Sequence, residues 1–458
     1  MVSNEKIKSI YLIAICGTGM ASLAGLLQKS GYRVTGSDTN IYPPMSTLLK
    51  SSGIDIKPGY QRKNISEDID QVIIGNAVSK DNQEVLAVQD KNIPYISFPE
   101  AIKKFYLENQ KSLVITGTHG KTTTTALLSW VLHSAKRKPG FMVGGWMKNF
   151  DGNHAISEGE FFVSEGDEYD TAFFDKGPKF LHYSPFASIL TGIEFDHADI
   201  FADLTAIQTQ FHHLIRTIPA EGLVITPHAV PAIEQTLQRG CWTPRQTLND
   251  VQSDWQLTET AEDGHSFTVQ HNQNTGKVDW SLLGQHNVNN ALAAIAAAHH
   301  VGVTVEHACE ALNQFKGVKR RLELRGERRG IRVYDDFAHH PTAIASTLQG
   351  LRANVGQQRL IAVLEPRSNT MKMGVHEHTL AASLNAADKV ILYQDPNLTW
   401  SLDNIQQQLG DSSVLLRNID DVVDQLVSQS KAGDHIVVMS NGGFGGIHQK
   451  ILDALAND

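Results

Sequence analysis

The sequence predicts an α/β protein made of three successive units. Its 458 residues are too many for a single hydrophobic core. Short apolar runs alternate with helical patterns along the chain, and this alternation indicates parallel sheets. Polar clusters repeatedly follow the apolar runs, and ligands in open α/β sheets bind at the carboxyl ends of the strands. The repetition supports ligand-binding edges more strongly than any single cluster does.

The composition argues against two classes of partner. The net charge is −9 and no long basic run occurs, so we expect no nucleic-acid partner. No stretch of about 18 apolar residues occurs and no secretory signal is evident, so we expect no membrane partner. The cysteines lie far apart, without metal or disulfide spacing, which predicts small buried side chains in a reducing cytoplasm. They are Cys16, Cys241 and Cys309.

The chain opens with a βαβ pattern. An apolar strand at residues 10–15 leads into a turn that contains Gly17 and Gly19. A helical pattern follows, and a second strand at residues 31–38 ends at Asp38. This arrangement is typical of nucleotide binding and places Asp38 to meet either a ribose or a helix N-terminus.

The dinucleotide signature in this unit is weak. Ser22 stands where the signature has its third Gly or Ala, so a nucleotide-like ligand other than NAD is favoured. Further strands at residues 72–77 and 93–96 extend a parallel sheet. We predict a first domain at residues 1–110.

The stretch T-G-T-H-G-K-T-T-T-T, residues 116–125, predicts a phosphate-binding loop. It follows a short apolar strand and precedes a helical run at residues 126–132. The backbone N–H groups of the turn, the helix start and Lys121 all favour phosphate oxygens. The Thr122 hydroxyl can bind a magnesium ion. Ile115 stands where the general motif has a glycine, so the loop departs from that motif at one position.

Two neighbouring strands end in groups that suit a metal ion. The strand at residues 161–163 is followed by S-E-G-D-E-Y-D, in which Glu165 comes first and is placed to face a metal. We expect Glu168 and Asp170 to lie in a solvated acidic loop. The next strand leads to His197, which is flanked by acids. Metal ligation is favoured for it over a capping or packing role.

The stretch that follows is less informative. Residues 208–216 predict a helix, with His212 and His213 at the surface or in packing. Residues 229–278 are polar and irregular, and we expect turns and peripheral strands there.

The next candidate functional segment is G-Q-H-N-V-N-N, which lies just before the apolar helix at residues 291–298. Asn287 and Asn290 are three residues apart and share one helix face. Two amides there can bind an adenine edge or cap the helix, although capping needs only one of them.

A third α/β unit follows the pair Arg320 and Arg321. Two adjacent arginines near a junction can form a solvated face or reach back to a terminal phosphate. Four strands are predicted after them, and all but the third are clearly followed by a polar cluster. They lie at residues 331–334, 360–364, 390–393 and 435–439.

In these motifs the chain resembles the Mur ligase family, which forms amide bonds to the muramyl peptide of the bacterial cell wall. The matching motifs occur in the family's order: T-G-T-H-G-K-T-T-T-T, S-E-G-D-E-Y-D, I-E-F-D-H, H-N-V-N-N-A, R-R-L-E and D-D-F-A-H-H-P. The resemblance implies a UDP-N-acetylmuramate-binding domain at residues 1–110, a P-loop-type ATPase domain at 111–320 and a peptide-binding domain at 321–458. The first and third domains are expected to be Rossmann-like.

The resemblance also implies roles for individual residues. ATP and Mg²⁺ are the implied cofactors, and the ATP loop is Gly117, Thr118, His119, Gly120, Lys121, Thr122 and Thr123. Thr122, Glu165 and His197 would serve the metal. Asn287 and Asn290 would hold the adenine. Arg321 would reach the γ-phosphate, and Asp336 would hold the ribose.

The chain departs from several members of the family in one respect. Those members use a carbamylated lysine soon after the metal histidine, but no lysine lies between His197 and Arg216. We therefore expect metal binding in this chain to occur without a carbamylated lysine.

Within the family, the chain looks most like members that add a whole peptide. The closer match lies in I-Y-P-P-M-S-T-L-L, E-Y-D-T-A-F-F-D-K, E-P-R-S-N-T-M-K-M-G and S-N-G-G-F-G-G-I-H. It implies ligation of the tripeptide L-Ala-γ-D-Glu-meso-diaminopimelate to UDP-N-acetylmuramate through an acyl phosphate, in peptidoglycan recycling. Gly17, Gly19, Asp38 and His119 are candidate sugar-nucleotide contacts, Arg367 and Ser368 candidate peptide contacts, and His340 a candidate general base.

Three alternatives stay open at this point. A ligase of the same family that adds L-alanine alone would use the free amino acid. A nucleotide-binding oxidoreductase would need a tight NAD site, against which Ser22 argues. A non-catalytic regulator would not need Lys121, Glu165, His197 and Arg321 together. The oligomeric state and the tolerance for longer peptides do not follow from the sequence.

Overall fold

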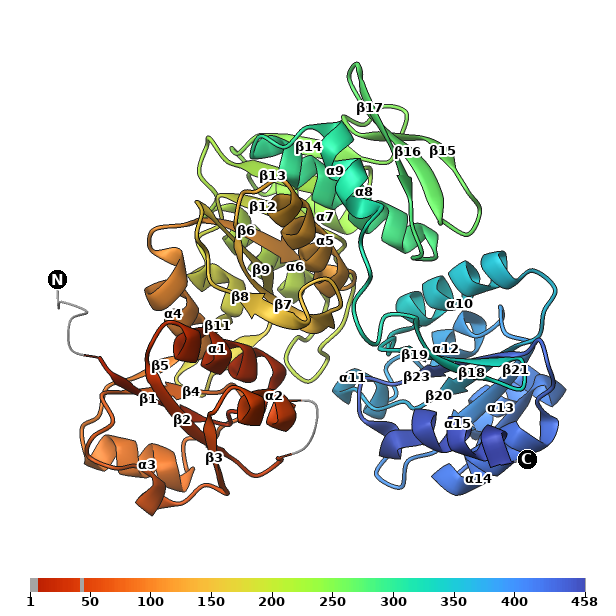
Figure 1. Ribbon diagram of the computed structural model, residues 1–458, viewed down its shortest axis with the longest axis horizontal. Coiled ribbons are helices and arrows are strands. Elements are labelled where there is room, and N and C mark those ends of the chain that lie inside the picture. Colours follow the sequence, from red (N-terminus) through yellow and green to blue (C-terminus); the bar gives the residue numbers. More distant parts are fainter. Residues whose placement is uncertain (1–6, 42–44, 458) are drawn as a thin grey trace.

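The structure is a computed structural model that describes residues 7–41 and 45–457. Three open α/β sheets follow one another along the chain, as Figure 1 shows. The I-Y-P-P-M-S-T-L-L stretch lies in part outside the described residues, at positions 42–44. Among the described helices, none has the length and apolar character needed to cross a membrane.

The first sheet has five parallel strands in the order β3-β2-β1-β4-β5. The strands are β1 (Ser9–Ile13), β2 (Arg33–Asp38), β3 (Asp55–Pro58), β4 (Gln71–Ile74) and β5 (Tyr95–Ser97). Its helices are α1 (Thr18–Lys29), α2 (Met45–Ser51), α3 (Gln83–Asp90) and α4 (Phe98–Ile102), with short turns η2 (Arg62–Asn64) and η3 (Lys103–Leu107). The predicted βαβ opening is confirmed.

The central sheet has seven strands in the order β14-β13-β12-β6-β9-β7-β8. They are β6 (Lys111–Thr116), β7 (Gly140–Met147), β8 (Gly152–Ala155), β9 (Phe161–Gly166), β12 (Ala187–Leu190), β13 (Leu223–Pro227) and β14 (Arg245–Leu248). Because β9 and β12 flank β6 in parallel, the loops after these three strands emerge side by side. This order brings the phosphate loop next to both predicted metal segments.

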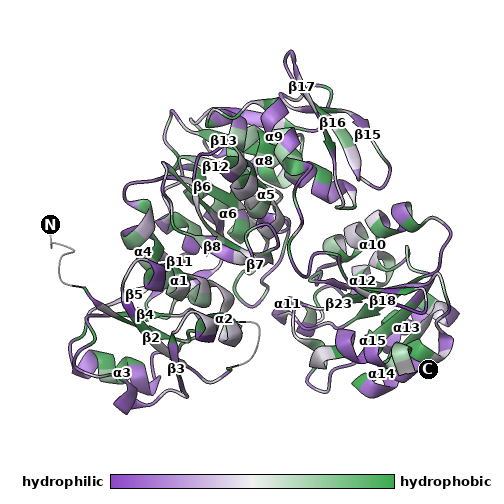
Figure 2. Ribbon diagram, viewed as in Figure 1, coloured by the Kyte–Doolittle hydropathy of each residue, from purple (hydrophilic) through white to green (hydrophobic). Residues whose placement is uncertain are grey.

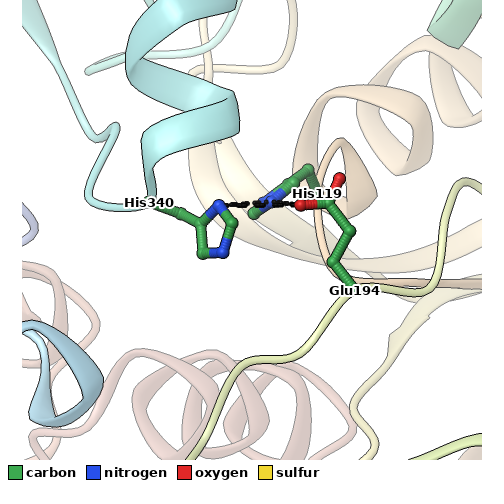
Figure 3. A group of neighbouring side chains, drawn as sticks. All are labelled: His119, Glu194 and His340. Atoms are coloured by element: carbon green, nitrogen blue, oxygen red, sulfur yellow. Dashed lines mark hydrogen bonds and ion pairs between the residues drawn. The ribbon is translucent and has the colours of Figure 1, made fainter. Parts of the chain in front are cut away.

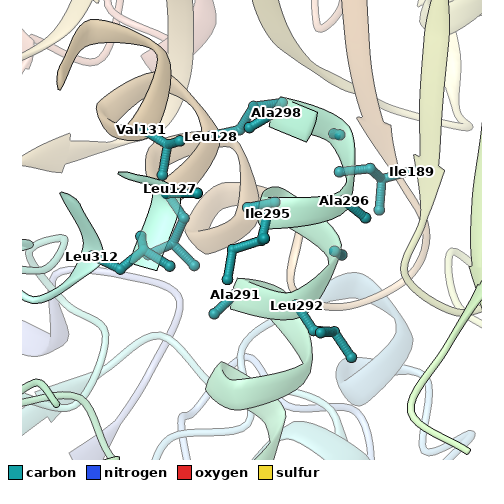
Figure 4. Packing of buried hydrophobic residues seen from close by; sticks show 14 of the residues in the cluster. Leu127, Leu128, Val131, Ile189, Ala291, Leu292, Ile295, Ala296, Ala298 and Leu312 are labelled. Atoms are coloured by element: carbon teal, nitrogen blue, oxygen red, sulfur yellow. The ribbon is translucent and has the colours of Figure 1, made fainter. Parts of the chain in front are cut away.

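Five helices accompany the central sheet: α5 (Lys121–Ser134), α6 (Leu204–Ile215), α7 (Pro231–Gln238), α8 (Gln285–His300) and α9 (Val305–Leu312). Helix α8 is apolar around most of its surface and is packed against α5, as Figure 4 shows. Leu127, Leu128 and Ile295 are fully buried there. The helix that follows the phosphate loop is therefore fixed in the largest core of the protein.

Residues 229–278 are more regular than predicted. They contain α7 and the edge strand β14, followed by an antiparallel sheet of β15 (Gln256–Thr260), β16 (Ser266–His271) and β17 (Asn274–Asp279). The peripheral strands were expected, but α7 was not, because it is only eight residues long. A small hairpin, β10 (Asp170–Ala172) and β11 (Asp175–Pro178), and the turn η4 (Lys179–His182) also belong to the central region.

The third sheet has the order β18-β19-β23-β20-β21-β22, with only β18 antiparallel. Its strands are β18 (Glu323–Arg328), β19 (Ile331–Asp336), β20 (Leu360–Leu364), β21 (Lys389–Tyr393), β22 (Ser413–Leu416) and β23 (His435–Met439). Its helices are α10 (Pro341–Val355), α11 (Asn369–Lys372), α12 (Glu377–Ser383), α13 (Asp403–Leu409), α14 (Ile419–Gln429) and α15 (Ile447–Asn457), with turns η5 (Gly410–Ser412) and η6 (Phe444–Gly446).

The hydropathy of the chain follows this architecture. Figure 2 shows the strongest hydrophobic colour on the inner strands and polar colour on outward helix faces and loops. All three cysteines are free thiols, but only Cys309 is buried. The expectation of three buried cysteines is therefore wrong for Cys16 and Cys241, which lie near turns and remain partly exposed.

The first domain is fastened to the central one through α1. The amide of Asn153 donates to Ser22 Oγ at 2.7 Å, and both residues are buried. Gly25 lies so close to the His154 ring that a Cβ there would be 2.5 Å from it. Ser22 thus serves an interdomain contact at the position where a dinucleotide-binding helix has Gly or Ala.

Candidate active site

The phosphate loop has the predicted strand–turn–helix form. Gly117 and Gly120 have φ of +122° and +84°, which favours glycine. A Cβ on Gly117 would collide with the Thr191 hydroxyl, and one on Gly120 would collide with the Asn290 amide. Both glycines are therefore required by packing as well as by the turn. The helix that follows begins at Lys121 and presents free N–H groups at the loop.

Lys121 lies among acidic groups. Its Nζ donates to the carbonyl of Gly117 at 2.7 Å and lies 3.3 Å from Glu168 and 3.9 Å from Asp167. Burial alone would lower the pKa of Lys121, but the nearby carboxylates raise it. The lysine is therefore held in its charged form, as phosphate binding requires.

Glu168 corrects a prediction. We expected a solvated side chain, but Glu168 is only 2% exposed and bridges Lys121 and His197. The Glu168 side chain points inward because its two partners, Lys121 and His197, lie beneath the loop. Asp170 does remain partly exposed and pairs with Lys176 at 2.9 Å.

Glu165 and Thr122 form an oxygen-rich pair. Thr122 Oγ1 donates to Glu165 Oε2 at 3.0 Å, and the amide of Gly144 donates to Oε1. Burial raises the pKa of Glu165, while the Gly144 hydrogen bond and the charges of Arg321 and Lys121 oppose this shift. A partly buried carboxylate beside a hydroxyl fits Mg²⁺, which prefers oxygen ligands.

His197 sits in a strained backbone conformation at the end of the loop after β12. Its φ is +54°, and its amide donates to Asp196 Oδ1 at 2.7 Å. The ring packs against Tyr169 with 4.8 Å between centroids, and Nε2 lies 3.7 Å from Glu168. His197 thus pairs with the carboxylate of Glu168, and its predicted role as a metal ligand beside Glu165 stays a prediction. Left-handed non-glycine residues of this kind are concentrated at functional sites.

The two asparagines of α8 that the sequence singled out differ in their contacts. Asn290 is buried and lines a cavity of about 190 Å³ together with Thr191, His228, Asn249 and Asn289. Asn287 instead donates its amide to the carbonyl of Leu283 at 2.7 Å, which is a helix-start contact. The structure thus places Asn290 beside a pocket near the phosphate loop, and it adds Asn289, which sequence reasoning missed.

The two arginines of the interdomain linker also differ. Arg320 donates to the carbonyls of Ser440 and Gly442 at 2.7 and 2.6 Å and lies within the third domain. Arg321 is exposed, and its guanidinium lies 5.1 Å from the Phe337 ring centroid. Its charge acts on Glu165 in the central domain. The predicted contact of Arg321 with the γ-phosphate stays a prediction.

Asp336 is engaged in this same linker. Its carboxylate accepts from the amides of Leu322 and Ala338 at 2.6 and 2.8 Å, and Thr347 Oγ1 lies 3.4 Å away. These bonds hold the linker turn, in which Leu322 has a φ of +47°. The predicted contact of Asp336 with the ribose stays a prediction.

The phosphate loop meets the third domain at a histidine pair. His119 Nε2 lies 3.1 Å from His340 Nδ1, and Glu194 Oε2 lies 3.6 and 3.8 Å from these two nitrogens. Figure 3 shows the three side chains converging. Thr342 Oγ1 donates to Glu194 at 2.7 Å. Glu194 was not singled out from the sequence, because its partners are 75 residues before it and 146 after it.

The E-P-R-S-N-T segment lies at the same seam. Thr370 donates to Asp196 at 2.7 Å, and Asn369 donates to Asp199 at 2.9 Å. Ser368 caps α11 through a hydrogen bond from the amide of Met371. Arg367 is about half exposed beside the buried Glu365, with 3.8 Å between their polar atoms.

In the first domain, Gly17 caps the start of α1, and Gly19 packs against Phe98. Asp38 accepts from the amides of Cys16 and Asn40, both at 2.8 Å. Of the two roles considered for Asp38, the contacts match the one at the start of the helix. Its predicted substrate contact stays a prediction.

Comparison with known protein families matches every part of this arrangement. The Mur ligase family catalytic domain matches residues 9–109, the Mur ligase middle domain matches 115–298, and the Mur ligase glutamate ligase domain matches 320–442. A relative in Escherichia coli (strain K12), UDP-N-acetylmuramate–L-alanyl-γ-D-glutamyl-meso-2,6-diaminoheptandioate ligase, is 49% identical over 98% of both chains.

Two further proteins are similar to this chain. A crystal structure of a murein peptide ligase from Psychrobacter arcticus 273-4 is 44% identical, covers 98% of this chain and 99% of its own, and has a TM-score of 0.76. A UDP-N-acetylmuramate–L-alanine ligase from Dictyoglomus turgidum is 30% identical over 97% of this chain and 96% of its own. The chain therefore belongs to the Mur ligase family, whose members are ATP-dependent amide ligases.

Proposed function

We propose that this protein joins the tripeptide L-alanyl-γ-D-glutamyl-meso-diaminopimelate to UDP-N-acetylmuramate in the cytoplasm, as a step in peptidoglycan recycling. Relatives that match almost the whole chain at 49% identity carry that activity in their names. The observation that carries the proposal is the contact of the phosphate loop with the third domain through His119 and His340. It lets ATP, held by the central domain, meet an acceptor held by the third.

We assign the sugar nucleotide to residues 1–110, ATP to residues 111–320 and the peptide to residues 321–458. This division follows the three sheets. The first domain is fastened to the central one by the Ser22–Asn153 hydrogen bond, so the sugar nucleotide and ATP are held in a fixed relation. The third domain must move to exchange the peptide, since ATP and peptide are bound by different domains.

The first step is phosphoryl transfer. A lactyl carboxylate oxygen bonds to the γ-phosphorus, the bond to ADP breaks, and an acyl phosphate forms. Two anions approach each other, so Lys121 and Arg321 must neutralise the charge that develops. A magnesium ion held by Thr122 and Glu165 would supply further charge neutralisation. His197 and Glu168 complete this edge of the site.

The second step needs a neutral amine. The amino nitrogen of the L-alanyl residue bonds to the acyl carbon, and inorganic phosphate leaves. Burial lowers the pKa of His340 to about 4, so its imidazole is neutral at physiological pH and can accept the amine proton. The amide of Thr342 points to Nδ1 at 3.3 Å, which keeps a lone pair on that atom. We assign His340 as the general base and His119 as the group that connects it to the phosphate loop.

The peptide end is assigned to the E-P-R-S-N-T segment. Its Thr370 and Asn369 contact the loop that carries His197, so this segment lies beside the reaction edge. Arg367 is exposed enough to meet a ligand carboxylate, and a guanidinium suits bidentate pairing with it.

One experiment tests the proposed function. Phosphate release from ATP is measured with UDP-N-acetylmuramate and with L-alanine, the dipeptide or the tripeptide as acceptor. We expect rapid turnover only with the tripeptide. Rapid turnover with free L-alanine would instead identify the L-alanine-adding activity named in the relatives that are about 30% identical. No phosphate release with any acceptor would reject both.

A further inference from the structure

We propose that His119, Glu194 and His340 form a binding site for a zinc-type divalent metal ion, distinct from the magnesium site at Thr122 and Glu165. The three ligand atoms are 3.1, 3.6 and 3.8 Å apart. These separations are close to the roughly 3.3–3.4 Å that divides neighbouring ligands of a tetrahedral ion with bonds of about 2.0 Å. One ion can therefore reach all three atoms once His340 Nδ1 exchanges its 3.3 Å hydrogen bond from the Thr342 amide for the metal.

The donor set selects the class of metal. Two imidazole nitrogens and one carboxylate oxygen suit Zn²⁺, Co²⁺ or Ni²⁺, whereas Mg²⁺ prefers oxygen ligands. Three protein ligands leave a fourth tetrahedral position for water or for a ligand atom. His119 and His340 point their nitrogens toward each other, and Glu194 closes the third side (Figure 3).

The surroundings favour a cation. The titratable groups that face His340 are the imidazoles of His119 and His376 and the carboxylates of Glu194 and Asp196. His376 faces both carboxylates and His119. His376 packs on His340 with 4.4 Å between ring centroids, and its buried Nε2 has no hydrogen-bond partner. The site thus combines two imidazoles with a carboxylate, and a divalent ion bound there would add positive charge beside Glu194 and Asp196.

Supporting contacts hold one of the ligands, Glu194, in place. Thr118 Oγ1 accepts from the backbone amide of Glu194 at 2.8 Å, so the backbone at Glu194 is anchored to the phosphate loop. Thr342, the second residue of α10, donates to the Glu194 carboxylate at 2.7 Å. Such outer contacts fix the orientation of metal ligands. The side chains of His119 and Glu194 are 26% and 40% exposed, which provides an entry path.

The site exists only when two domains meet. His119 and Glu194 belong to the central domain, and His340 belongs to the third. A bound ion would therefore clamp the phosphate loop to the start of α10. It would also occupy the lone pair that the proposed general base needs. We infer that zinc binding stabilises the closed arrangement and inhibits the ligase.

Cobalt is the probe of choice, because four-coordinate Co²⁺ has strong visible absorption. The full-length protein is freed of metal by EDTA and titrated with Co²⁺. We expect visible bands that saturate at one ion per chain, disappear on addition of one equivalent of Zn²⁺, and persist in millimolar Mg²⁺. His340→Ala and Glu194→Gln should each weaken binding at least about tenfold. His213→Ala, at an exposed histidine on α6, should bind as the parent does.

Two results of the cobalt titration would reject the proposed metal site. Failure of Co²⁺ to bind, or equal binding by the parent, His340→Ala and Glu194→Gln proteins, would overturn the site. The two variants lie on different domains, and circular dichroism identifies any that is misfolded, so one of them suffices.

A second measurement follows the rate of phosphate release with and without Zn²⁺. This measurement alone rests on the proposed ligase activity, and we expect roughly tenfold or greater inhibition, reversed by EDTA. The cobalt titration decides the metal site even if no ligase activity is found. Inhibition by Zn²⁺ without the cobalt bands would place the zinc elsewhere and reject the site.

Discussion

Glu168 Oε2 lies 3.3 Å from Lys121 Nζ, and its Oε1 lies 3.7 Å from His197 Nε2. One buried carboxylate thus joins the cation of the phosphate loop to the histidine after β12. ATP phosphates that bind at Lys121 must compete with this ion pair. Glu168 can then turn its charge toward His197 and a metal ion, which makes it a participant in the site and not a solvated neighbour.

Lys121→Ala should abolish amide formation, with a loss on the order of 10²-fold or more, because the transferring phosphoryl group loses a full positive charge. Binding of UDP-N-acetylmuramate should persist, since the sugar nucleotide is assigned to the first domain. Isothermal titration calorimetry and phosphate release test the two halves separately. Retained ligase turnover would reject the phosphate-loop assignment.

Glu168→Gln should lower turnover by about 10²-fold and weaken Mn²⁺ binding, because the amide keeps the shape of the side chain but cannot balance a metal or Lys121. Metal binding is measured by the electron paramagnetic resonance of free Mn²⁺. Glu158→Gln is the matched control, since Glu158 pairs with Lys138 on the exposed surface. If both variants behave as the parent protein does, Glu168 takes no part in metal binding or turnover.

Substitution of Arg321 should affect the rate of phosphate release, whereas substitution of Arg320 should affect the stability of the protein. Arg321→Ala should slow phosphate release by about 10³-fold with little change in unfolding, because Arg321 is exposed and acts on developing charge. Arg320→Ala should cost about 2 kcal/mol in unfolding free energy, since it removes two carbonyl contacts within the third domain. Denaturant titration and steady-state kinetics on both variants provide the cross-check. The reversed pattern would exchange their roles.

Arg367→Ala should raise KM for the tripeptide by roughly ten- to a hundredfold and leave KM for the sugar nucleotide unchanged, because a charge-assisted contact contributes about 1.5–3 kcal/mol. Arg367→Lys should restore little, since lysine cannot pair in a bidentate way. Gly442 borders this side chain so closely that Gly442→Ala should displace it. An equal rise in both KM values would indicate a general disturbance.

The parts that sequence reasoning predicted well depend on local rules. The phosphate loop follows from glycines, a lysine and an apolar strand within ten residues. The strands β6, β9 and β12 follow from short apolar runs, and their ends approach because parallel neighbours share an edge. Strands β3 and β22 were missed because they are partly exposed along their length and carry a weaker apolar signal.

The errors concern partners far away in the sequence. Glu168 is buried because Lys121 lies 47 residues before it, and no pattern in an acidic loop states this. Glu194 becomes part of the site only when the third domain brings Thr342 and His340 to it. Local chemistry predicts candidates, and packing decides among them.

His154 should make the stability of the interface between the first two domains depend on pH. It is buried against α1, and burial lowers its pKa from 6.5 to about 4. His154 takes up a proton less readily in the folded state than in the unfolded state. The stability that neutral His154 contributes is therefore complete above pH 6.5 and is lost as the pH falls toward 4.

The shift corresponds to about 3 kcal/mol at most. In His154→Gln, the unfolding free energy should therefore fall less steeply between pH 6.5 and 4. The change in slope should correspond to at most one bound proton. Denaturant unfolding at a series of pH values measures this, with His213→Gln as the exposed control. An unchanged slope in His154→Gln would mean that His154 is protonated in the folded protein. Since Asn153 and His154 face Ser22 and Gly25 respectively, the same titration reports on how firmly the first domain is held.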